Sequence, residues 1–493
     1  MLTLDSPSEI FFTSDGGCDT IRFMSNDTWD ASSSVSWIHI VPEKGESSEP
    51  VIIVLNCDSN TSVDERTAVI TISAGNMTKK IKVKQAYDPF YKLGTIYKLG
   101  TLPILYIYTE NESEILSKEE YVNAKYWLKD IEGGKGSLGS ANAPLDMLIK
   151  GRGNATWRAS EKKPYRIKLS EKQSLLGMNP NKHFVLLSGI DDNRITFLNY
   201  PLAFEYSRRI GLGWTPELRQ VEVILNGDYR GLYFLVEKIR IDKDRINIKE
   251  QKDGEEDPQK VTGGWLLEFD NTEDPQQLIF AEGNGNELAV KYHSPDSLSD
   301  KQRAYLQWLM EKCNECIYTK DKTNNEWEEY VDVESLAKFY IVQEVMGHRE
   351  AFMGSTYLYK DRGENEKLKF GPLWDMGNWV LLGNYEHFIY ENTPYTDKIH
   401  WIEEIAKFPH FQEVVRKIWG SFRYKLDTSA LEEEVVAKLE TAAENNFIRW
   451  PEEGWTGSLL NGKKRFDEAK EAKRLFLESV WGVSTSNPNK SNE

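Results

Sequence analysis

Over the first 87 residues, apolar and polar side chains alternate with a period of two. The apolar members are mostly β-branched, and Gly, Asn, Asp and Ser separate the runs. The runs are Ile10–Thr13, Thr20–Phe23, Val51–Leu55, Ala68–Ile72 and Lys80–Lys84. Because successive side chains of a strand point to opposite faces, and short, regularly spaced strands are typical of sandwiches, this pattern predicts a small all-β domain over residues 1–87. A linker is expected over residues 88–101.

From residue 102 the pattern changes to mixed α and β. A glycine-bearing turn, Gly151–Trp157, follows one apolar run, and a helical pattern from Thr196 ends at Gly211, as helices often do. Asn226-Gly227 lies between two further runs and strongly favours a tight hairpin. The predicted strands are Leu102–Tyr108, Leu145–Lys150, Lys163–Leu169, Val221–Leu225 and Leu232–Glu237.

The C-terminal part is predicted to be largely helical. Ser299 and Gln302 have the spacing of a capping box at a helix start, and Phe411–Val480 carries apolar residues at helical spacing. Cys313 and Cys316 fall in a helical stretch, and no second Cys or His pair completes a zinc site. A polar, disordered tail is expected over residues 484–493.

Composition narrows the range of partners. With 61 Lys and Arg against 78 Asp and Glu, the net charge of −17 argues against nucleic acid as a general partner, because phosphate backbones need clustered cations. The chain has no run of about eighteen apolar residues, so no transmembrane helix is predicted. The N-terminal residues show no signal peptide, and a chain from which the signal has been removed has the same pattern. Cys18 and Cys57 could pair only if adjacent strands bring them together, and two free thiols are the favoured interpretation.

One stretch has the spacing of the catalytic and metal-binding loops of protein kinases. Those loops read His-Arg-Asp, four residues and Asn, followed later by Asp-Phe-Gly. This chain reads His-Arg-Glu350, four residues and Ser355, followed later by Asp375-Met-Gly. The spacing puts Glu350 where the base stands and Ser355 and Asp375 where the metal ligands stand, and Asn378 can supply a further oxygen.

Five ordered segments resemble the CotH kinase family, which is similar in fold to protein kinases. The segments are Arg152–Trp157, Lys162–Leu169, Asn226–Glu237, Gly263–Glu268 and Ser355–Asp361. The resemblance implies a two-lobed α+β domain, with a small lobe over residues 102–260 and a large lobe over 261–483 that is helical toward its C-terminal end. It also implies phosphorylation of Ser or Thr on secreted or surface proteins, using ATP with Mg²⁺ or Mn²⁺.

The residues expected at such a site fall into three groups. Glu350 and Asp375 are the catalytic candidates, with Glu350 orienting the acceptor hydroxyl. Lys168 is expected to clamp the ATP phosphates and Glu205 to orient Lys168. The full set of ATP-binding candidates is Arg152, Gly153, Lys168, Glu205 and Glu237, and the metal-binding candidates are Asp375, Ser355 and Asn378.

Residues 1–87 resemble the BACON domains of exported Bacteroidetes proteins, through Gly16-Gly17, Trp29, Ser36-Trp37 and the Ile70–Gly75 run. The resemblance implies an immunoglobulin-like sandwich and an extracytoplasmic location, at the cell surface or in the periplasm, including as a lipoprotein. It also implies glycan binding. The alternative interpretation is that Trp29 and Trp37 pack in the core or at an edge and the domain is a spacer.

Three positions depart from the family pattern: Glu350 replaces a shorter acid, Ser355 an Asn, and Gly377 a second carboxylate. A displacement of about 1 Å at a reacting group can cost about a hundredfold in rate. Two functions therefore stay open: an active kinase, and a non-catalytic surface protein that binds a glycan or protein partner on a pseudokinase fold. Glycoside hydrolysis has little support, because no carboxylate pair is singled out.

Overall fold

The computed structural model describes residues 1–60, 65–86, 97–131, 134–189, 197–270, 275–377, 379–381, 385–391, 393, 398–451 and 459–482. Asn378, most of the expected linker and the whole polar tail lie outside them. Contacts divide the chain into two compact units. The first comprises Met1–Glu114, Val122–Met147 and Glu222–Gly231, and the second Ile115–Tyr121, Leu148–Val221 and Leu232–Glu493.

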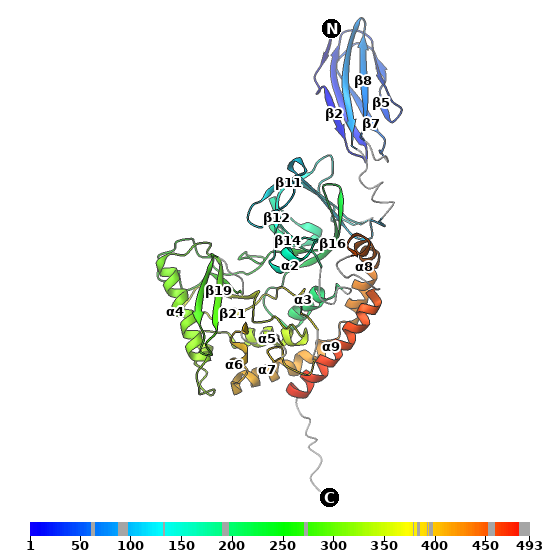
Figure 1. Ribbon diagram of the computed structural model, residues 1–493. Helices are drawn as coiled ribbons and strands as arrows, with labels where there is room; N and C mark the ends of the chain where they lie inside the picture. Colours follow the sequence, from blue (N-terminus) through cyan, green and yellow to red (C-terminus); the bar gives the residue numbers. More distant parts are fainter. Residues whose placement is uncertain are drawn as a thin grey trace. The chain divides into compact units, whose positions relative to one another are not determined.

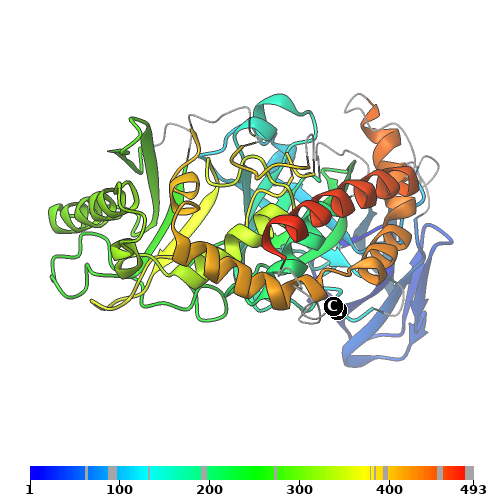
Figure 2. The same cartoon turned by 90° about the horizontal axis from the view of Figure 1, so that it is seen from below.

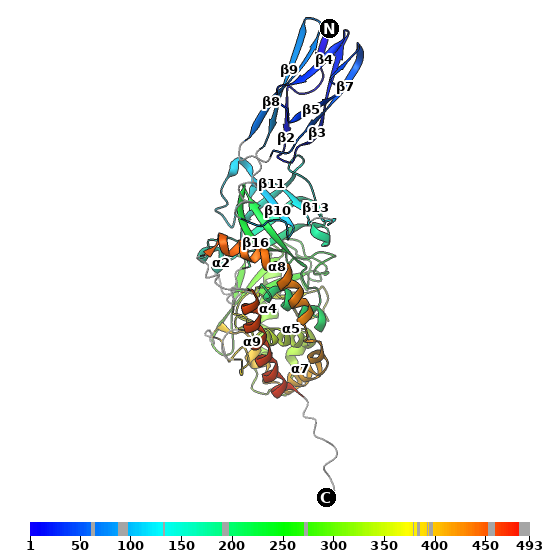
Figure 3. The same cartoon turned by 90° about the vertical axis from the view of Figure 1, so that its right-hand side faces the viewer.

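The N-terminal strands form two sheets, with orders β1-β3-β7-β5 and β2-β9-β8-β4-β6. Alternation along β8, Arg66–Ala74, buries every second side chain, as the period of two predicts. One hydrophobic core takes residues from both sheets, including Ile21, Ile53, Ile70 and Ile81. The strands, in blue in Figures 1 and 3, are β1 (Leu2–Leu4), β2 (Glu9–Phe12), β3 (Gly17–Ser25), β4 (Trp29–Ser33), β5 (Ile38–Val41), β6 (Lys44–Gly45), β7 (Ser48–Cys57), β8 and β9 (Met77–Gln85).

The two tryptophans of this domain are packed rather than open. Trp29 is 5% exposed in the core and donates its indole N–H to the Glu46 carbonyl. Trp37 packs against the core, and the Arg66 guanidinium lies 4.2 Å from its ring centroid. The packing interpretation of both rings therefore fits the structure. Cys18 and Cys57, on neighbouring strands, are free thiols as expected.

The next seven strands follow the order β10-β11-β12-β13-β14-β16-β15 in a closed barrel. Asn226 and Gly227, with φ of 51° and 75°, turn β15 into β16, which confirms the predicted hairpin. The strands are β10 (Ile104–Thr109), β11 (Val122–Lys129), β12 (Leu145–Gly151), β13 (Tyr165–Gln173), β14 (Asn181–Leu187), β15 (Leu218–Leu225) and β16 (Asp228–Glu237).

A five-stranded sheet of order β18-β19-β17-β20-β21 follows, which the sequence pattern did not predict. Its central strand β17 reads Trp-Leu-Leu-Glu-Phe and is buried on both faces, so it shows no alternation. Helix α4 packs against β18 (Figure 1). The strands are β17 (Trp265–Phe269), β18 (Gln277–Ala281), β19 (Glu287–Ser294), β20 (Thr356–Lys360) and β21 (Lys369–Phe370).

The C-terminal part is helical as predicted, and α5, α7 and α9 pack on one another, with α9 in red in Figure 2. Ser299 and Gln302 form the predicted capping box of α4, and Gly211 ends α3 in the left-handed conformation. Within the described residues no helix has both the length and the apolar character needed to cross a membrane. The helices are α2 (Ala155–Ala159), α3 (Asn199–Ile210), α4 (Asp300–Ile317), α5 (Val333–Val345), α6 (Ile402–Ile405), α7 (Pro409–Phe422), α8 (Ser429–Arg449) and α9 (Leu459–Trp481), with 3-10 turns at Glu110–Glu112, Leu175–Gly177, Glu326–Glu329 and Arg423–Lys425.

Candidate functional site

Two of the predicted metal-binding residues contact each other. Ser355 immediately precedes β20 and Asp375 follows β21, so the pairing of these two strands brings the residues together. The Ser355 hydroxyl donates to Oδ2 of Asp375 over 3.3 Å. Both residues have positive φ, 50° and 56°, a conformation that costs energy for residues other than glycine and is found preferentially at functional sites.

A second carboxylate, Glu268 of β17, lies near this pair. Glu268 is 7% exposed, and its Oε2 is 2.5 Å from Nε2 of His293 on β19. On β20, the residue opposite Glu268 is Tyr357, whose ring stacks on His293 with centroids 5.3 Å apart. We call Glu268 and Asp375, with Ser355, Tyr357, His293 and Arg152, the acid centre.

The surroundings of the two carboxylates in the acid centre shift their pKa values in opposite directions. Burial raises the pKa of Asp375, the charge of Glu268 raises it further, and Arg152 and the Ser355 hydrogen bond oppose the rise. Burial also acts to raise the pKa of Glu268, but the hydrogen bond and charge of His293 outweigh it and leave that pKa lowered. Glu268 is thus held as a carboxylate, whereas Asp375 lacks a cation strong enough to offset its burial.

Arg152 reaches the acid centre from the turn after β12. Its guanidinium lies 5.7 Å from the centroid of the Trp374 ring, next to Asp375 in the chain. The turn is shaped by its own residues: a Cβ on Gly151 would lie 2.5 Å from the Trp157 ring, and a Cβ on Gly153, at φ 82°, would lie 2.5 Å from Thr156.

The backbone of this turn is not free to bind an anion at the first two positions. The Gly151 N–H donates to the Ser117 carbonyl and the Arg152 N–H to that of Pro164. The backbone N–H groups of Gly151 and Arg152 are therefore already bonded within the chain. The Arg152 side chain is the part of the turn that faces the acid centre.

Lys168 and Glu205 are not joined in the described structure. Lys168 lies on the exposed side of β13. Glu205 of α3 pairs instead with Arg209, at 2.7 Å, and with Arg208, at 3.9 Å. The expected Lys168–Glu205 ion pair is thus replaced, in the described part of the chain, by pairs within α3.

The side chain of Glu237, at the end of β16, lies in the protein interior and makes its contacts there. Its side chain is fully buried, Oε2 accepts the Glu217 N–H over 3.0 Å, and Oε1 lies 3.6 Å from Nε of Arg245. Burial raises the pKa of Glu237. Its side chain therefore supports the chain after β16 and offers no exposed atom to a ligand.

The His-Arg-Glu350 loop divides into a buried and a half-exposed part. His348 is 2% exposed, its Nδ1 lies 2.9 Å from Oε1 of Gln343, and burial lowers its pKa to about 4. This agrees with a structural role for His348. Glu350 is half-buried at the surface side of the loop.

The donor set suits a metal only in part. In the ranges that the structure describes, no three or more His, Cys, Asp or Glu side chains are grouped to hold an ion. Mg²⁺, however, is usually bound through one or two carboxylates together with substrate phosphates and waters. Asp375, with the Ser355 hydroxyl beside it, fits that smaller requirement, and Glu268 is the nearby carboxylate that sequence reasoning did not assign. Its signal was present in the Gly263–Glu268 segment.

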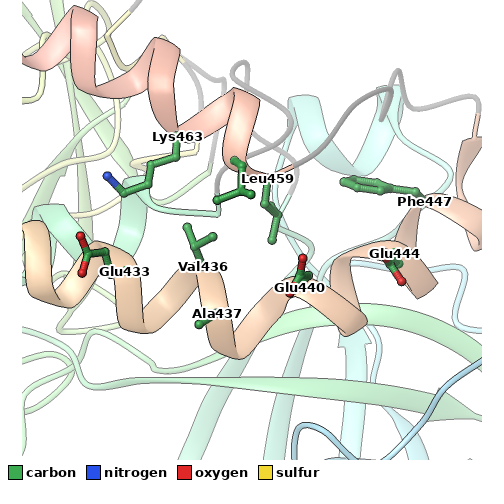
Figure 4. A pocket seen from close by; sticks show the side chains of 9 residues that line it. Glu433, Val436, Ala437, Glu440, Glu444, Phe447, Leu459 and Lys463 are labelled. Carbon is green, nitrogen blue, oxygen red and sulfur yellow. The ribbon is translucent and has the colours of Figure 1, made fainter.

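A separate hollow of about 440 Å³ lies between α8 and α9 (Figure 4). Val436, Ala437 and Leu459 give it an apolar wall, and Glu433, Glu440, Glu444 and Lys463 carry charges around it. It shares no lining residue with the acid centre.

Comparison with known families gives two matches in the predicted order. The model described as CotH kinase protein matches residues 149–477, more than half of the chain. The BACON model, described as an N-terminal binding domain, matches residues 27–86. Both resemblances seen in the sequence are therefore confirmed. No curated protein matches the chain.

Matching solved structures include a Bacteroides ovatus GH5 xyloglucanase in complex with a XXXG heptasaccharide, at 27% identity over 18% of this chain and 19% of that chain, with a TM-score of 0.17. Domains 4 and 5 of the S-layer protein SbsC match at 14% identity over 17% and 51%, with a TM-score of 0.15. A Bacteroides thetaiotaomicron protein solved by NMR matches at 14% identity over 17% and 84%, with a TM-score of 0.12. The chain covers about a fifth of the xyloglucanase, and at these TM-scores the matches carry no argument.

Proposed function

The chain belongs to the CotH kinase protein family, and on this basis we propose that it is an atypical kinase that transfers a phosphoryl group from ATP to a Ser or Thr hydroxyl of a protein. One observation carries the proposal: Asp375 is held by Ser355, in a strained backbone conformation, within reach of the charges of Arg152 and Glu268. Strained, poorly neutralised carboxylates are more common at functional sites than elsewhere.

In this proposal Asp375 and Ser355 hold Mg²⁺ or Mn²⁺, and Asn378 adds an oxygen. The metal, when bound, neutralises charge on the transferred phosphoryl group. Arg152 stabilises negative charge beside Asp375, and Lys168 contacts phosphate oxygens. Glu350 orients the acceptor hydroxyl. Glu268 is the second carboxylate of the acid centre, and its contacts with His293 and Tyr357 keep it ionised.

We place the acid centre in a two-lobed kinase-like domain, with lobes over residues 102–260 and 261–483. For residues 1–87 we propose an immunoglobulin-like sandwich that acts outside the cytoplasm, at the cell surface or in the periplasm, and binds a glycan. In this proposal the glycan site does not use Trp29, whose ring is buried in the core.

A second function, a non-catalytic binding protein, is favoured by one specific observation. Kinases hold the phosphate-binding Lys with a helix Glu, and here the ion pairs of Glu205 in the described chain go to Arg208 and Arg209. A pseudokinase that binds nucleotide or a partner without transfer is consistent with that arrangement.

Calorimetry with ATP and MgCl₂ on the full chain separates these functions. We expect metal-dependent ATP binding that is lost in Asp375→Asn and retained in Asp300→Asn, a matched change at an exposed position of α4. Transfer of ³²P from ATP to a Ser- and Thr-containing acceptor protein, reduced at least tenfold in Glu350→Gln, supports the kinase. Binding without transfer to any acceptor supports the pseudokinase, and no ATP binding at millimolar concentration overturns both nucleotide-based readings.

A further inference from the structure

The hollow between α8 and α9 follows one side of α8, with Glu433 at one end and Glu444 at the other (Figure 4). The lining residues of α8 repeat at three- and four-residue intervals, which places them on one side of the helix. They are Glu433, Val436, Ala437, Glu440, Glu444 and Phe447. From Glu433 to Glu444 the helix rises about 16 Å, at about 1.5 Å per residue. We call this elongated hollow, which Leu459, Leu460 and Lys463 of α9 complete, the α8 groove.

The floor of the α8 groove is apolar and partly open to water. Val436 and Leu459 are buried, whereas Ala437 is exposed. Leu460, at the start of α9, is 64% exposed and is among the most exposed large apolar side chains of the described chain. Covering these side chains with another apolar surface removes them from water, which is favourable.

Three glutamates, Glu433, Glu440 and Glu444, give the rim of the α8 groove a negative charge. Among the ion pairs of the described residues, none involves these three carboxylates, although α8 and α9 form several others. Lys463 is the one cation among the described residues that line the groove, and its Nζ pairs with Asp467 at 2.7 Å. The charge of Lys463 is therefore already matched, and the negative charge of the rim is left for a partner.

We propose that the α8 groove is a docking site for an amphipathic helix of another protein, with apolar side chains on one face and Lys or Arg beside them. Three- and four-residue spacing forms the seam along which a second helix packs its apolar side chains. The rim selects the flanking residues of that helix, because unpaired carboxylates attract cations and repel acids. The proposal does not depend on kinase activity.

A second copy of this chain does not fit the α8 groove as well as a basic partner does. Each copy has a net charge of −17, so association would bring a further strongly negative molecule to an acidic rim. Charge complementarity therefore favours a partner of opposite sign.

The test uses a synthetic helical peptide of about three heptads, with Leu at positions a and d and Lys at e and g. Calorimetry on the full chain should show saturable binding with a Kd below about 100 μM. A peptide with Ser in place of Leu should bind at least about tenfold more weakly, because it cannot cover the apolar floor. A peptide with Glu in place of Lys should show no measurable binding.

Variants of the full chain locate the binding. Ala437→Arg adds bulk and a cation at an exposed position of the floor and should weaken the Leu and Lys peptide at least about tenfold. Glu440→Gln and Glu444→Gln should each weaken it about threefold, the effect expected of one exposed ion pair. Glu434→Gln is the matched control, because Glu434 is an exposed glutamate of α8 that does not line the groove.

Binding that is weakened by Ala437→Arg, Glu440→Gln and Glu444→Gln, and unchanged by Glu434→Gln, supports the proposal. Equal losses in Glu434→Gln and Glu440→Gln overturn it, because the peptide then responds to the general negative charge of the protein. Absence of binding also overturns it.

Sedimentation velocity of the full chain tests the other occupant. Dimerisation of the parent that is lost in Ala437→Arg would assign the α8 groove to a second copy and overturn the proposal. Should Ala437→Arg unfold the protein, Leu460→Ser replaces it in both measurements, since Leu460 is mostly exposed and contributes little to the core.

Discussion

The hydroxyl of Ser355 donates to Oδ2 of Asp375 while both residues hold left-handed backbone conformations. In a protein kinase the position of Ser355 carries an Asn, whose amide oxygen contacts metal. The shorter Ser reaches the carboxylate itself. The substitution therefore places a hydroxyl that donates to Asp375, the proposed metal ligand, where a protein kinase has an amide oxygen.

Asp375→Asn is expected to lose metal-dependent ATP binding and to gain stability. Burial raises the pKa of Asp375 above its unfolded value of 3.8, so the carboxylate opposes folding at any pH above that value. Asn keeps an acceptor for Ser355 and removes the buried charge. We expect a gain of about 0.5–2 kcal/mol at pH 7, within the usual range for relieving a functional site.

Urea unfolding of the variant and the parent at several pH values measures this effect. The gain should shrink as pH falls toward 3.8, because both states of the parent then carry the proton. A loss of stability at pH 7 would show that Asp375 is held by its partners more strongly than burial opposes it.

Lys238→Met is expected to stabilise the chain at neutral pH. Burial, with the charges of Arg166, Arg240 and Arg245 and against that of Asp296, lowers the pKa of Lys238 from 10.5 to about 7. The unfolded chain therefore binds one more proton than the folded chain between those values, and parental stability rises with pH across this window.

The variant's advantage should accordingly be at least about 1 kcal/mol at pH 7, the worth of one pKa unit being 1.36 kcal/mol, and should disappear near pH 10.5. Denaturant midpoints at pH 7, 8.5 and 10 provide the measurement, with Lys182→Met as control. An advantage that does not change with pH would assign it to packing instead of charge.

Lys473→Met should destabilise the helical part severely. Nζ of Lys473 on α9 lies 2.7 Å from Oε2 of Glu344 on α5, and the Glu344 side chain is fully buried. Removing the cation leaves a buried, unpaired carboxylate, a change that costs about 3–5 kcal/mol. The double variant Glu344→Leu with Lys473→Met should recover most of the loss. A double variant no more stable than Lys473→Met would contradict this explanation.

Gly263→Ala and Gly420→Ala are expected to change the stability of the protein in opposite directions. A Cβ at Gly263, just before β17, would lie 1.8 Å from the Asp361 carbonyl oxygen, and backbone cannot move aside cheaply. We expect a loss of about 1–3 kcal/mol or more. Gly420, inside α7, has nothing within 4 Å of such a Cβ, so Ala should stabilise by up to about 1 kcal/mol. Thermal melts of the two variants side by side check both signs.

Sequence pattern predicted the elements that are exposed on one side. The alternating runs of the N-terminal domain, the Asn226-Gly227 hairpin and the capping box at Ser299 all appear where expected, because each rests on a local rule. The sheet of β17 to β21 escaped prediction, since its central strand is buried on both faces and has no alternation to read.

The candidate site was predicted in part. Ser355 and Asp375 were expected at one site because their spacing follows that of protein-kinase loops, and in the structure a hydrogen bond joins them. Glu205 was assigned as the partner of Lys168 because it lies in a helix. It pairs instead with Arg208 and Arg209, three and four residues further along the same helix. Glu268 and His293 were not paired, because β17 and β19 are separated by β18 in the chain and only the sheet order brings them together.

The contact of Gly151 with the Trp157 indole means that the residues at these two positions can change in size only together. Any side chain at 151 would occupy space that the ring already fills, so a larger residue there is tolerable only if residue 157 shrinks at the same time. Arg152 lies between them in sequence. Substituting both residues together would therefore change the direction of the Arg152 side chain while keeping the arginine. An engineer who wished to retune the acid centre while keeping all of its own residues would start with these two.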